Sequence, residues 1–328
     1  MEKKNIAVLG AGNMGTAITK VLSENGNVVH LWNWNGDPTP IEQILETREN
    51  TKYLPGVLLG DSVFPMLDME KALEHADIVF FIVPSSNVQK VVEEAKAFLQ
   101  KDAILVDMSK GLNKETLEII PDVLKRVTEN KFPVVSISGP AIAKQLAEGE
   151  FTTMDISGEE TSMNEVRAVF ENDYLKLVPT DDMVGVELGG SFKNVYAILL
   201  GICDGLGYDL NLKSSLISKA LDEMVAIGCA MGGKRETCYC LSGLGDLVGT
   251  ALSPDSRNRR FGECLGKGMT KEEALNTVQQ TVEGIEADEV LLALGKKFKI
   301  ELPLAELVKR ILDGANPEEE VKEYLKNL

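Results

Sequence analysis

The stretch that decides the fold reads Ile6-Ala7-Val8-Leu9-Gly10-Ala11-Gly12-Asn13-Met14-Gly15. It predicts a short apolar strand over residues 6–9, a turn with GxGxxG spacing, and a helix over residues 16–23. In a dinucleotide-binding fold, Gly10 permits the tight turn, Gly12 lets the backbone approach a pyrophosphate, and Gly15 lets the helix pack on the strand. The helix N-terminus also favours an anion. The stretch therefore predicts a dinucleotide site at the start of the chain.

The remainder of the first half alternates between strand and helix patterns. An amphipathic helix is predicted over residues 88–99, and further strands over residues 27–34, 76–83, 103–108, 134–138, 152–157 and 175–178. In an open α/β sheet, ligands bind in the loops that follow the carboxyl ends of the strands. Lys110, followed by the permissive Gly111, lies in such a loop and is predicted to contact a ligand. Residues 1–182 are therefore predicted to form a Rossmann-like domain.

A change of pattern begins near residue 184, in the stretch Val186-Glu187-Leu188-Gly189-Gly190-Ser191-Phe192-Lys193-Asn194-Val195-Tyr196. From there the apolar spacing is helical, with one long helix over residues 214–231 and a final helix after Pro317. Lys193 stands at this change, beside two glycines that allow close approach of backbone or ligand. The fold class is thus α/β, with an N-terminal Rossmann-like dinucleotide-binding domain and, over residues 183–328, an all-helical C-terminal substrate domain.

The composition indicates a globular protein of the cytoplasm. With 328 residues, 44% of them hydrophobic, the chain is long enough for two domains. Its net charge of −17 argues against binding to nucleic acid or to an anionic membrane. We find no apolar run of the roughly 20 residues needed to cross a bilayer, and no signal peptide. The five cysteines lack zinc-ligand spacing, so reduced cysteines and no metal site are predicted.

Proton transfer in this chain would have to rest on a lysine or a carboxylate. Only two histidines are present, His30 and His75, and neither lies in the company expected of a catalytic base. Lys193 is therefore the candidate for acid–base work. Asp246, in the glycine-rich turn over residues 241–247, is a carboxylate that the pattern predicts to be buried.

A basic cluster over residues 256–260 stands out in this acidic chain. Ser256 or Asp255 is predicted to cap a helix whose first turn holds Arg257 and Asn258. A helix N-terminus with an arginine and an amide forms a good phosphate site. For the two arginines that follow, Arg259 and Arg260, a solvated basic face is the alternative interpretation.

Eight motifs in order resemble the NAD(P)-dependent glycerol-3-phosphate dehydrogenases of the bacterial and archaeal type. They are GAGNMG at 10–15, VPSS at 83–86, SKGL at 109–112, SGPAIA at 138–143, ELGGSFKNVYAI at 187–198, LSGLGDLVGT at 241–250, SRNRRFG at 256–262 and VEG at 282–284. The resemblance spans nearly the whole chain and implies the two-domain fold predicted above. It also implies the reversible reduction of dihydroxyacetone phosphate to sn-glycerol 3-phosphate, which supplies glycerol phosphate for phospholipid synthesis.

The resemblance further assigns roles to residues. Lys193 matches the family's catalytic lysine, which donates a proton to the carbonyl oxygen in reduction and accepts it in oxidation. Asp246 matches the carboxylate that orients this lysine, and Lys110 a second lysine near the substrate. The implied substrate contacts are Lys110, Gly139, Ala141, Lys193, Asn194, Asp246, Thr250, Ser256, Arg257 and Asn258. The implied cofactor contacts are Gly10, Gly12, Asn13, Met14, Gly15, Trp34, Pro84, Lys110, Ala143, Arg257 and Glu283.

The chemistry agrees with a lysine in this role. Hydride delivered to a ketone leaves an alkoxide, which must be stabilised and protonated. A free lysine has a pKa of about 10.4, so we expect the pocket to lower the pKa of Lys193. Desolvation and a neighbouring cation both act in that direction, and Lys110 is the candidate cation. The resemblance also implies a small phosphorylated substrate and a homodimer, with neither nucleic acid nor stable membrane insertion.

Several positions depart from the common family pattern. Met14 stands where an aromatic residue is usual, Gln89 where an arginine is common, and Ala141 where a serine or threonine is usual. The second strand is followed by Asn33, Trp34 and Asn35, and not by the acid that reads NAD or the arginine that reads NADP. The sequence therefore leaves both cofactors, NAD and NADP, open.

Two other functions fit part of the sequence. A dehydrogenase of the same architecture that acts on a short keto or hydroxy acid would also use a lysine and an anion-binding cation. The pair of Arg257 and Asn258 at a helix start suits a phosphate dianion better than a carboxylate. A nucleotide-sensing protein without catalysis would keep the glycine turn, but we would not expect it to keep Lys193 and Asp246.

Overall fold

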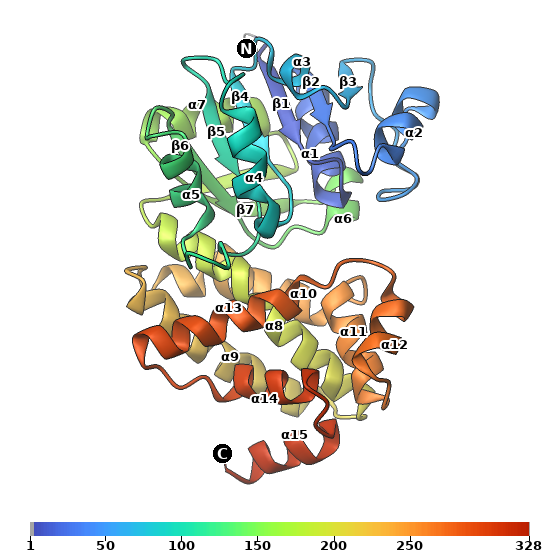
Figure 1. Ribbon diagram of the computed structural model, residues 1–328, viewed down its shortest axis with the longest axis vertical. Helices are drawn as coiled ribbons and strands as arrows, with labels where there is room; N and C mark the ends of the chain where they lie inside the picture. The colour runs from blue at the N-terminus through green and yellow to red at the C-terminus, as the bar shows by residue number, and fades with distance from the viewer. Residues whose placement is uncertain (1–2, 328) are drawn as a thin grey trace. The chain divides into compact units, whose positions relative to one another are not determined.

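The computed structural model describes residues 3–327 and divides into two compact units. The first unit runs to Asn113 and then covers Glu118–Met183. The second covers the short segment Lys114–Leu117 and the chain from Val184 onward. Figure 1 shows the first as a sheet with helices on both of its faces and the second as an assembly of helices.

The first unit is built on one sheet of eight strands, in the order β3-β2-β1-β4-β5-β6-β7-β8. All neighbouring strands are parallel except β6 and β7, so the last two strands run against the others. The first six strands have the order typical of a dinucleotide-binding fold, with its change of direction between β1 and β4. The strands are β1 Asn5–Leu9, β2 Val28–Trp32, β3 Val63–Met66, β4 Ile78–Phe81, β5 Ile104–Asp107, β6 Val134–Ser138, β7 Thr152–Ser157 and β8 Leu175–Thr180.

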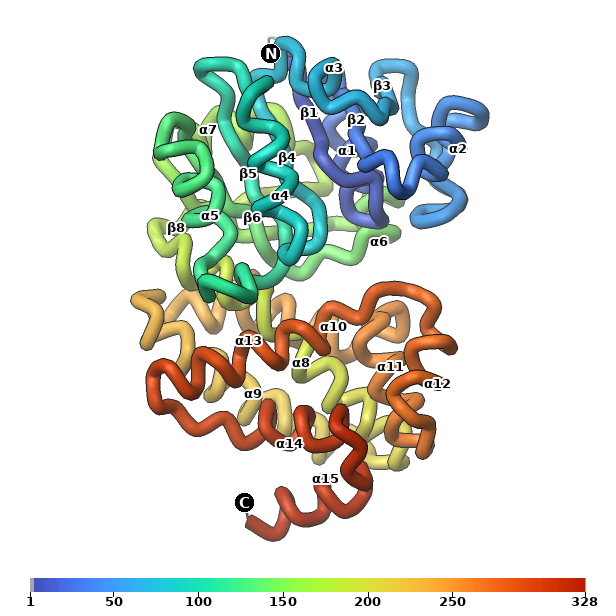
Figure 2. Tube along the Cα trace, in the orientation of Figure 1, coloured from blue at the N-terminus to red at the C-terminus, as the bar shows by residue number. Residues whose placement is uncertain are grey.

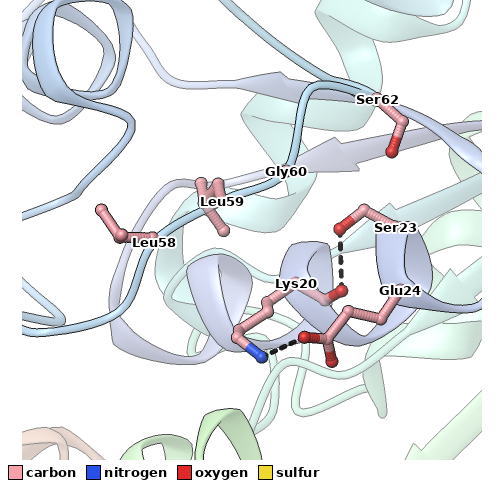
Figure 3. A pocket seen from close by; sticks show the side chains of 7 residues that line it. All are labelled: Lys20, Ser23, Glu24, Leu58, Leu59, Gly60 and Ser62. Atoms are coloured by element: carbon pink, nitrogen blue, oxygen red, sulfur yellow. Dashed lines mark hydrogen bonds and ion pairs between the residues drawn. The ribbon is translucent and has the colours of Figure 1, made fainter.

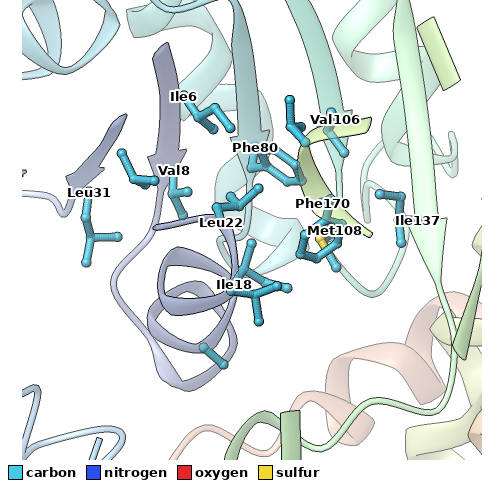
Figure 4. Packing of buried hydrophobic residues seen from close by; sticks show 14 of the residues in the cluster. Ile6, Val8, Ile18, Leu22, Leu31, Phe80, Val106, Met108, Ile137 and Phe170 are labelled. Carbon is cyan, nitrogen blue, oxygen red and sulfur yellow. The ribbon is translucent and has the colours of Figure 1, made fainter. Parts of the chain in front are cut away.

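Both faces of this sheet are buried, because alternate side chains of a strand point to opposite faces. In β1, Ile6 and Val8 join the apolar cluster on the side of α1 (Figure 4), whereas Ala7 and Leu9 join the cluster under α4. Such continuous apolar strands are typical of a parallel sheet between two helical layers. The helices of this unit are α1 Asn13–Glu24, α2 Thr39–Thr47, α3 Met69–Leu73, α4 Ser85–Ala95, α5 Ile120–Val127, α6 Ala143–Ala147 and α7 Glu160–Phe170.

The second unit consists of helices and the turns that join them, and α8 runs through its middle (Figure 2). The residues of α8 from Gly185 to Cys203 are all buried. Its helices are α8 Met183–Gly205, α9 Leu210–Ala230, η1 Thr237–Tyr239, η2 Leu241–Gly245, α10 Asp246–Leu252, α11 Arg257–Gly266, α12 Lys271–Val278, α13 Glu283–Phe298, α14 Pro303–Leu312 and α15 Pro317–Lys326. The predicted fold class, a Rossmann-like domain followed by an all-helical domain, is confirmed.

Two expectations from the sequence need correction. The helix predicted over residues 88–99 is α4, which begins at Ser85 and ends at Ala95, where the chain enters a turn closed by the Phe98 N–H and the Ala95 carbonyl. The statement that no apolar run is long enough to cross a bilayer was wrong, because α8 passes that test by length and composition. The qualifying window of α8 is completely buried, as expected of a core helix.

Candidate active site

The glycine turn between β1 and α1 has the geometry of a dinucleotide-binding turn. Gly10 has a φ of +118°, and a Cβ there would lie 2.4 Å from the Ile82 carbonyl oxygen. A Cβ on Gly15 would lie 1.8 Å from the Gly10 carbonyl oxygen, so α1 packs directly on the turn. A Cβ on Gly12, by contrast, would meet no atom within 4 Å. Internal packing thus explains Gly10 and Gly15, whereas Gly12 fits a backbone that a ligand approaches.

The start of α1 offers groups that can bind an anion. No side chain caps this end of the helix, so its first N–H groups can meet a ligand's acceptor oxygens. These observations fit the pyrophosphate of a dinucleotide. Met14, Ala141 and Ala143, three predicted contacts, are part-exposed and pack against the apolar cluster beneath α1.

Two buried asparagines hold the glycine turn in place. The Ala11 N–H donates to the Asn33 Oδ1 at 3.3 Å, and the Asn50 Nδ2 donates to the Ala11 carbonyl at 2.9 Å. Asn50 also donates to the Thr16 Oγ1 at 2.8 Å. The turn is therefore held on both its donor and its acceptor side. Sequence reasoning missed Asn50, because no spacing signal marks a lone asparagine in a loop.

Loops at the carboxyl ends of β5 and β6 bring two predicted residues together. The Lys110 Nζ donates to the Gly139 carbonyl oxygen at 3.4 Å, and the Ala141 N–H donates to the same oxygen at 2.9 Å. Pro84, at the start of α4, follows the neighbouring strand β4 and is exposed. The predicted ligand-binding loops of the first unit thus include a half-buried cation beside a carbonyl group.

In the second unit, Lys193 lies at the centre of a buried polar cluster. It sits inside α8, and not at the start of the helix, with 5% of its surface exposed. Its ammonium group donates to the carboxylate of Asp246, and to the Thr250 Oγ1 at 2.7 Å. Asp246 and Thr250 share a face of α10 because they are four residues apart. The ion pair is almost fully removed from water, with side chains only 7% and 2% exposed.

Close packing of backbones positions this cluster. A Cβ on Gly189 would lie 2.5 Å from the carbonyl oxygen of Ser242, so η2 rests directly on α8 one turn before Lys193. The close approach predicted beside Lys193 therefore occurs, and its partner is the chain itself. Because Asp246 follows η2 immediately, this contact fixes the distance between the carboxylate and the lysine.

The residues of the predicted phosphate site lie at the start of α11. Ser256 caps the helix, and its side chain accepts a hydrogen bond from the Arg259 N–H at 3.2 Å. The guanidinium of Arg257 makes no hydrogen bond or ion pair with any of residues 3–327. A positive charge without a partner, beside the N–H groups at the start of a helix, is suited to a phosphate dianion.

A chain of hydrogen bonds connects this site to the lysine helix. The Asn258 Oδ1 accepts from the Gly284 N–H at 2.9 Å, and the neighbouring Glu283 accepts from the Asn194 Nδ2 at 3.3 Å. Asn194 and Asn258 are 4% and 7% exposed. The start of α13 thus bridges Asn194, beside Lys193, and Asn258, beside Arg257, so these predicted residues of the second unit lie close together.

Arg259 is not part of a solvated basic face, the alternative considered for it. Its Nε donates to Asp204 at 2.6 Å, and Lys213 donates to the other oxygen of Asp204 at 2.6 Å. Burial raises the pKa of Asp204, but the bonds from Lys213 and Arg259 outweigh burial, so the pKa lies below its ordinary value. The ion pair ties the first turn of α11 to the end of α8.

Four glycines bring the same two helices into direct contact. On α8, a Cβ at Gly201 or Gly205 would lie 2.0 or 2.4 Å from carbonyl oxygens of α11. On α11, a Cβ at Gly262 or Gly266 would lie 2.0 or 2.3 Å from carbonyl oxygens of α8. The helices that carry Lys193 and Arg257 therefore meet backbone to backbone.

A separate hollow of about 330 Å³ lies at the far end of α1 (Figure 3). Lys20 and Glu24 form an ion pair at its wall, and Figure 3 shows both charges turned toward each other. The glycine turn, with the predicted cofactor contacts Gly12, Asn13 and Met14, lies at the opposite, N-terminal end of the helix. The lining residues are Lys20, Ser23, Glu24, Leu58, Leu59, Gly60 and Ser62.

Comparison with known proteins shows what this chain is similar to. Residues 5–164 match the model of the NAD-dependent glycerol-3-phosphate dehydrogenase N-terminus, and residues 182–323 that of the C-terminus. The chain is 38% identical to a glycerol-3-phosphate dehydrogenase [NAD(P)+] of Shewanella halifaxensis, covering 98% of this chain and 95% of the relative. It is 35% identical to the corresponding protein of Bacillus subtilis, covering 98% and 94%.

A solved structure is similar over the whole length. The crystal structure of glycerol-3-phosphate dehydrogenase from Coxiella burnetii superposes with a TM-score of 0.94 at 34% identity. The match covers 98% of this chain and 99% of that chain. Sequence and structure therefore agree on the same relatives across both units.

Proposed function

The chain belongs to the NAD-dependent glycerol-3-phosphate dehydrogenase family, and we propose that Lys193 moves the proton of its reaction. The protein is an NAD(P)-dependent oxidoreductase that interconverts dihydroxyacetone phosphate and sn-glycerol 3-phosphate. The observation that carries the proposal is the buried ion pair of Lys193 with Asp246, supported by Thr250.

The chemistry assigns a protonated lysine to the reductive direction. When bound, the nicotinamide supplies a hydride to the carbonyl carbon of the substrate, and the carbonyl oxygen becomes an alkoxide. The Lys193 ammonium donates a proton to that oxygen, which completes the alcohol and leaves a neutral amine. Asp246 stabilises the ammonium, because an opposite charge within hydrogen-bonding distance favours the charged form. In oxidation, the amine takes the proton back.

The neighbouring side chains hold the substrate in this proposal. Asn194 and Thr250 contact the reacting oxygens, while Arg257, Asn258 and the Ser256 cap bind the phosphate. The guanidinium of Arg257 has no partner among residues 3–327, and this supports the assignment because its charge is left for a ligand. It also favours a phosphorylated substrate over the short keto or hydroxy acid of the alternative. In the first unit, Lys110, Gly139 and Ala141 are the further substrate contacts proposed.

The proposed cofactor site begins at the glycine turn. The fit rests on the open space at Gly12 and the uncapped start of α1. Lys110 belongs to the first unit and Lys193 to the second, so the expected effect of Lys110 on the pKa of Lys193 stays a prediction. The proposed contacts are Gly10, Gly12, Asn13, Met14, Gly15, Trp34, Pro84, Lys110, Ala143, Arg257 and Glu283.

Replacement of the lysine tests the proposal directly. In Lys193→Ala, we expect reduction of dihydroxyacetone phosphate to fall by about 10³-fold or more, because the alkoxide loses its proton donor. Binding of NADH, measured by titration calorimetry, should be retained. Lys271→Ala, a change at an exposed lysine of α12, is the matched control. A kcat of Lys193→Ala close to that of the unaltered protein would exclude Lys193 from the proton transfer.

The setting of the enzyme is part of the same proposal. We propose a cytoplasmic homodimer whose product supplies the glycerol phosphate of phospholipid synthesis. The buried core position of α8 supports a protein that does not insert into a membrane. Light scattering coupled to gel filtration measures the oligomeric state, and the mass of a single chain would contradict the dimer.

A further inference from the structure

The turn that follows β2 is placed to read the adenosine half of the cofactor. In dinucleotide-binding folds, an acidic residue at this point bonds the ribose 2′-OH of NAD, whereas an arginine accommodates the 2′-phosphate of NADP. Here the turn reads Asn33-Trp34-Asn35-Gly36-Asp37. The sequence alone left the choice of cofactor open, but the contacts of this turn distinguish the two.

Trp34 presents an open aromatic surface at this turn. It is 57% exposed, whereas its neighbour Trp32 is 4% exposed and donates its indole N–H to the Leu67 carbonyl. A Cβ on Gly36 would lie 2.1 Å from the Trp34 ring, so the ring is seated directly on the glycine. One side of the indole is thereby supported and much of its surface is left to solvent. Such a ring can stack a base, as aromatic side chains do in nucleotide-binding proteins.

The turn is fixed relative to the glycine turn that binds pyrophosphate. Asn33 accepts a hydrogen bond from the Ala11 N–H and donates through its Nδ2 to the Asp37 carbonyl oxygen at 2.7 Å. One buried side chain therefore connects the two turns. Trp34 lies between Asn33 and Asp37, so the backbone that carries its ring is held relative to the glycine turn.

Negative charge at the turn comes from Asp37. Its carboxylate accepts from the Lys52 Nζ at 2.7 Å and from the Tyr53 hydroxyl at 2.8 Å. Burial raises the pKa of this carboxyl group, but the bonds from Lys52 and Tyr53 outweigh burial, so the pKa lies below its ordinary value. Asp37 is therefore ionised at neutral pH.

Positive charge at the turn is already engaged. The only lysine and arginine between residues 27 and 63 are Lys52 and Arg48. Lys52 pairs with Asp37, and the Arg48 guanidinium donates to the carbonyl oxygens of Leu59, Gly60 and Val63. A 2′-phosphate at this turn would thus meet the Lys52–Asp37 ion pair and no uncommitted cation from this segment.

We propose that Trp34 stacks the adenine ring and that the turn over residues 33–37 selects NAD(H) against NADP(H). The inference rests on the proposed dinucleotide site at the glycine turn. It adds the specificity-determining residues, namely Trp34 as the platform and Asp37 as the group that keeps the Lys52 ammonium engaged and away from a 2′-phosphate.

Binding measurements test the platform without relying on turnover. Titration calorimetry compares NADH with NADPH, and AMP with adenosine 2′,5′-bisphosphate. In each pair, the molecule without a 2′-phosphate should bind about tenfold or more tightly. Trp34→Ala should weaken the binding of NADH and AMP by about tenfold, while Trp34→Phe should retain most of the affinity for both. Phe151→Ala, which removes another exposed aromatic of the same unit, is the control and should change neither.

Two further variants test the rejection of the 2′-phosphate. Trp34→Arg should bring the affinities for NADH and NADPH close together or invert their order. Asp37→Asn should reduce the ratio of the NADH affinity to the NADPH affinity by about tenfold. Equal affinity of the unaltered protein for NADH and NADPH would overturn the inference, as would a Trp34→Ala variant that binds NADH normally.

The same titrations separate this inference from the proposed function. A protein that reduces dihydroxyacetone phosphate equally well with both cofactors keeps its proposed function and loses the selectivity. A protein that binds NADH selectively through Trp34, but whose Lys193→Ala variant retains its kcat, keeps the selectivity and loses the proposed mechanism.

Discussion

Two buried carboxylate sites lie against α8, one helical turn apart, and they handle their charge in opposite ways. At the first, Lys193 on α8 pairs with Asp246. At the second, Tyr196 on α8 donates to Glu223 at 3.0 Å, and nearby Asp288 on α13 has no hydrogen-bond partner for either oxygen among residues 3–327. Burial is similar, with 6% of Glu223 and none of Asp288 exposed.

The two sites differ in the partner of the buried carboxylate. Asp246 has a cation beside it, so charge can be kept in the absence of water. Burial raises the pKa of Glu223 to about 7, although the N–H groups of Leu304 and Ala305 and the Tyr196 hydroxyl act against it. Burial raises the pKa of Asp288 to about 8. Depth of burial alone therefore does not distinguish these carboxylates, whereas the partner of each one does.

The largest expected effect comes from removing the charge at the first site. Asp246→Asn should lower kcat by about 10³-fold with a smaller change in KM, because the ammonium of Lys193 loses its compensating charge and its orientation. The comparison predicts that Asp288→Asn, at the second site, leaves kcat within about twofold. Steady-state kinetics of the two variants, with circular dichroism to confirm folding, checks both. Equal losses of kcat in the two variants would show that Asp246 and Asp288 do not differ in their importance for turnover.

An intermediate effect is expected at the phosphate end of the first site. Arg257→Ala should raise the KM for dihydroxyacetone phosphate by about 10- to 100-fold, since a charge-assisted bond to phosphate is lost. Arg260→Ala, at the exposed arginine of the same helix, is the control and should leave the KM nearly unchanged. An unaltered KM in Arg257→Ala would remove Arg257 from the site.

The smallest effect concerns stability at the second site. The folded-state pKa values of Glu223 and Asp288, about 7 and about 8, lie above their ordinary values of 4.5 and 3.8. The folded state therefore binds more protons, and stability that is present below pH ~4 is lost as the pH rises through ~7 to ~8. The Asp288→Asn substitution should remove much of that loss. At pH ~8 the free energy of unfolding of this variant should exceed that of the unaltered protein by about 1–3 kcal/mol.

Urea denaturation at pH ~5 and pH ~8 measures this difference. Asp255→Asn, at an exposed carboxylate, is the control and should keep the pH dependence of the unaltered protein. A free energy of unfolding that falls equally with pH in Asp288→Asn and in the unaltered protein would show that Asp288 is not the group that titrates.

Local sequence patterns predicted the parts of the fold that depend on local physics. The glycine turn follows from backbone sterics at Gly10 and Gly15, and the cap of α11 from a serine ahead of the first helical turn. No strand was predicted between residues 35 and 75, yet this segment holds β3. Pro65 within β3 hid the strand, because proline is accommodated only at a sheet edge, where β3 lies.

The site was less predictable than the fold, because its pairs join residues far apart in the chain. Lys193 was singled out from its surroundings, but its pairing with Asp246 came from the resemblance to a family and not from spacing. The ion pair of Arg259 with Asp204 and the isolation of Asp288 left no local signal at all. Contacts of this kind depend on how helices pack, which a pattern of period 3.6 does not encode.

The glycine contact between α8 and α11 has a consequence for the evolution of specificity. Because main chains touch at Gly201, Gly205, Gly262 and Gly266, no side chain acts as a spacer between these two helices. Most substitutions in the surrounding core therefore cannot lengthen or shorten the span from the Lys193 helix to the start of α11. In the proposed site, the distance between Lys193 and the phosphate-binding residues is therefore set by main-chain contact. We expect this distance to persist as the sequence diverges, unless one of these four glycines is replaced.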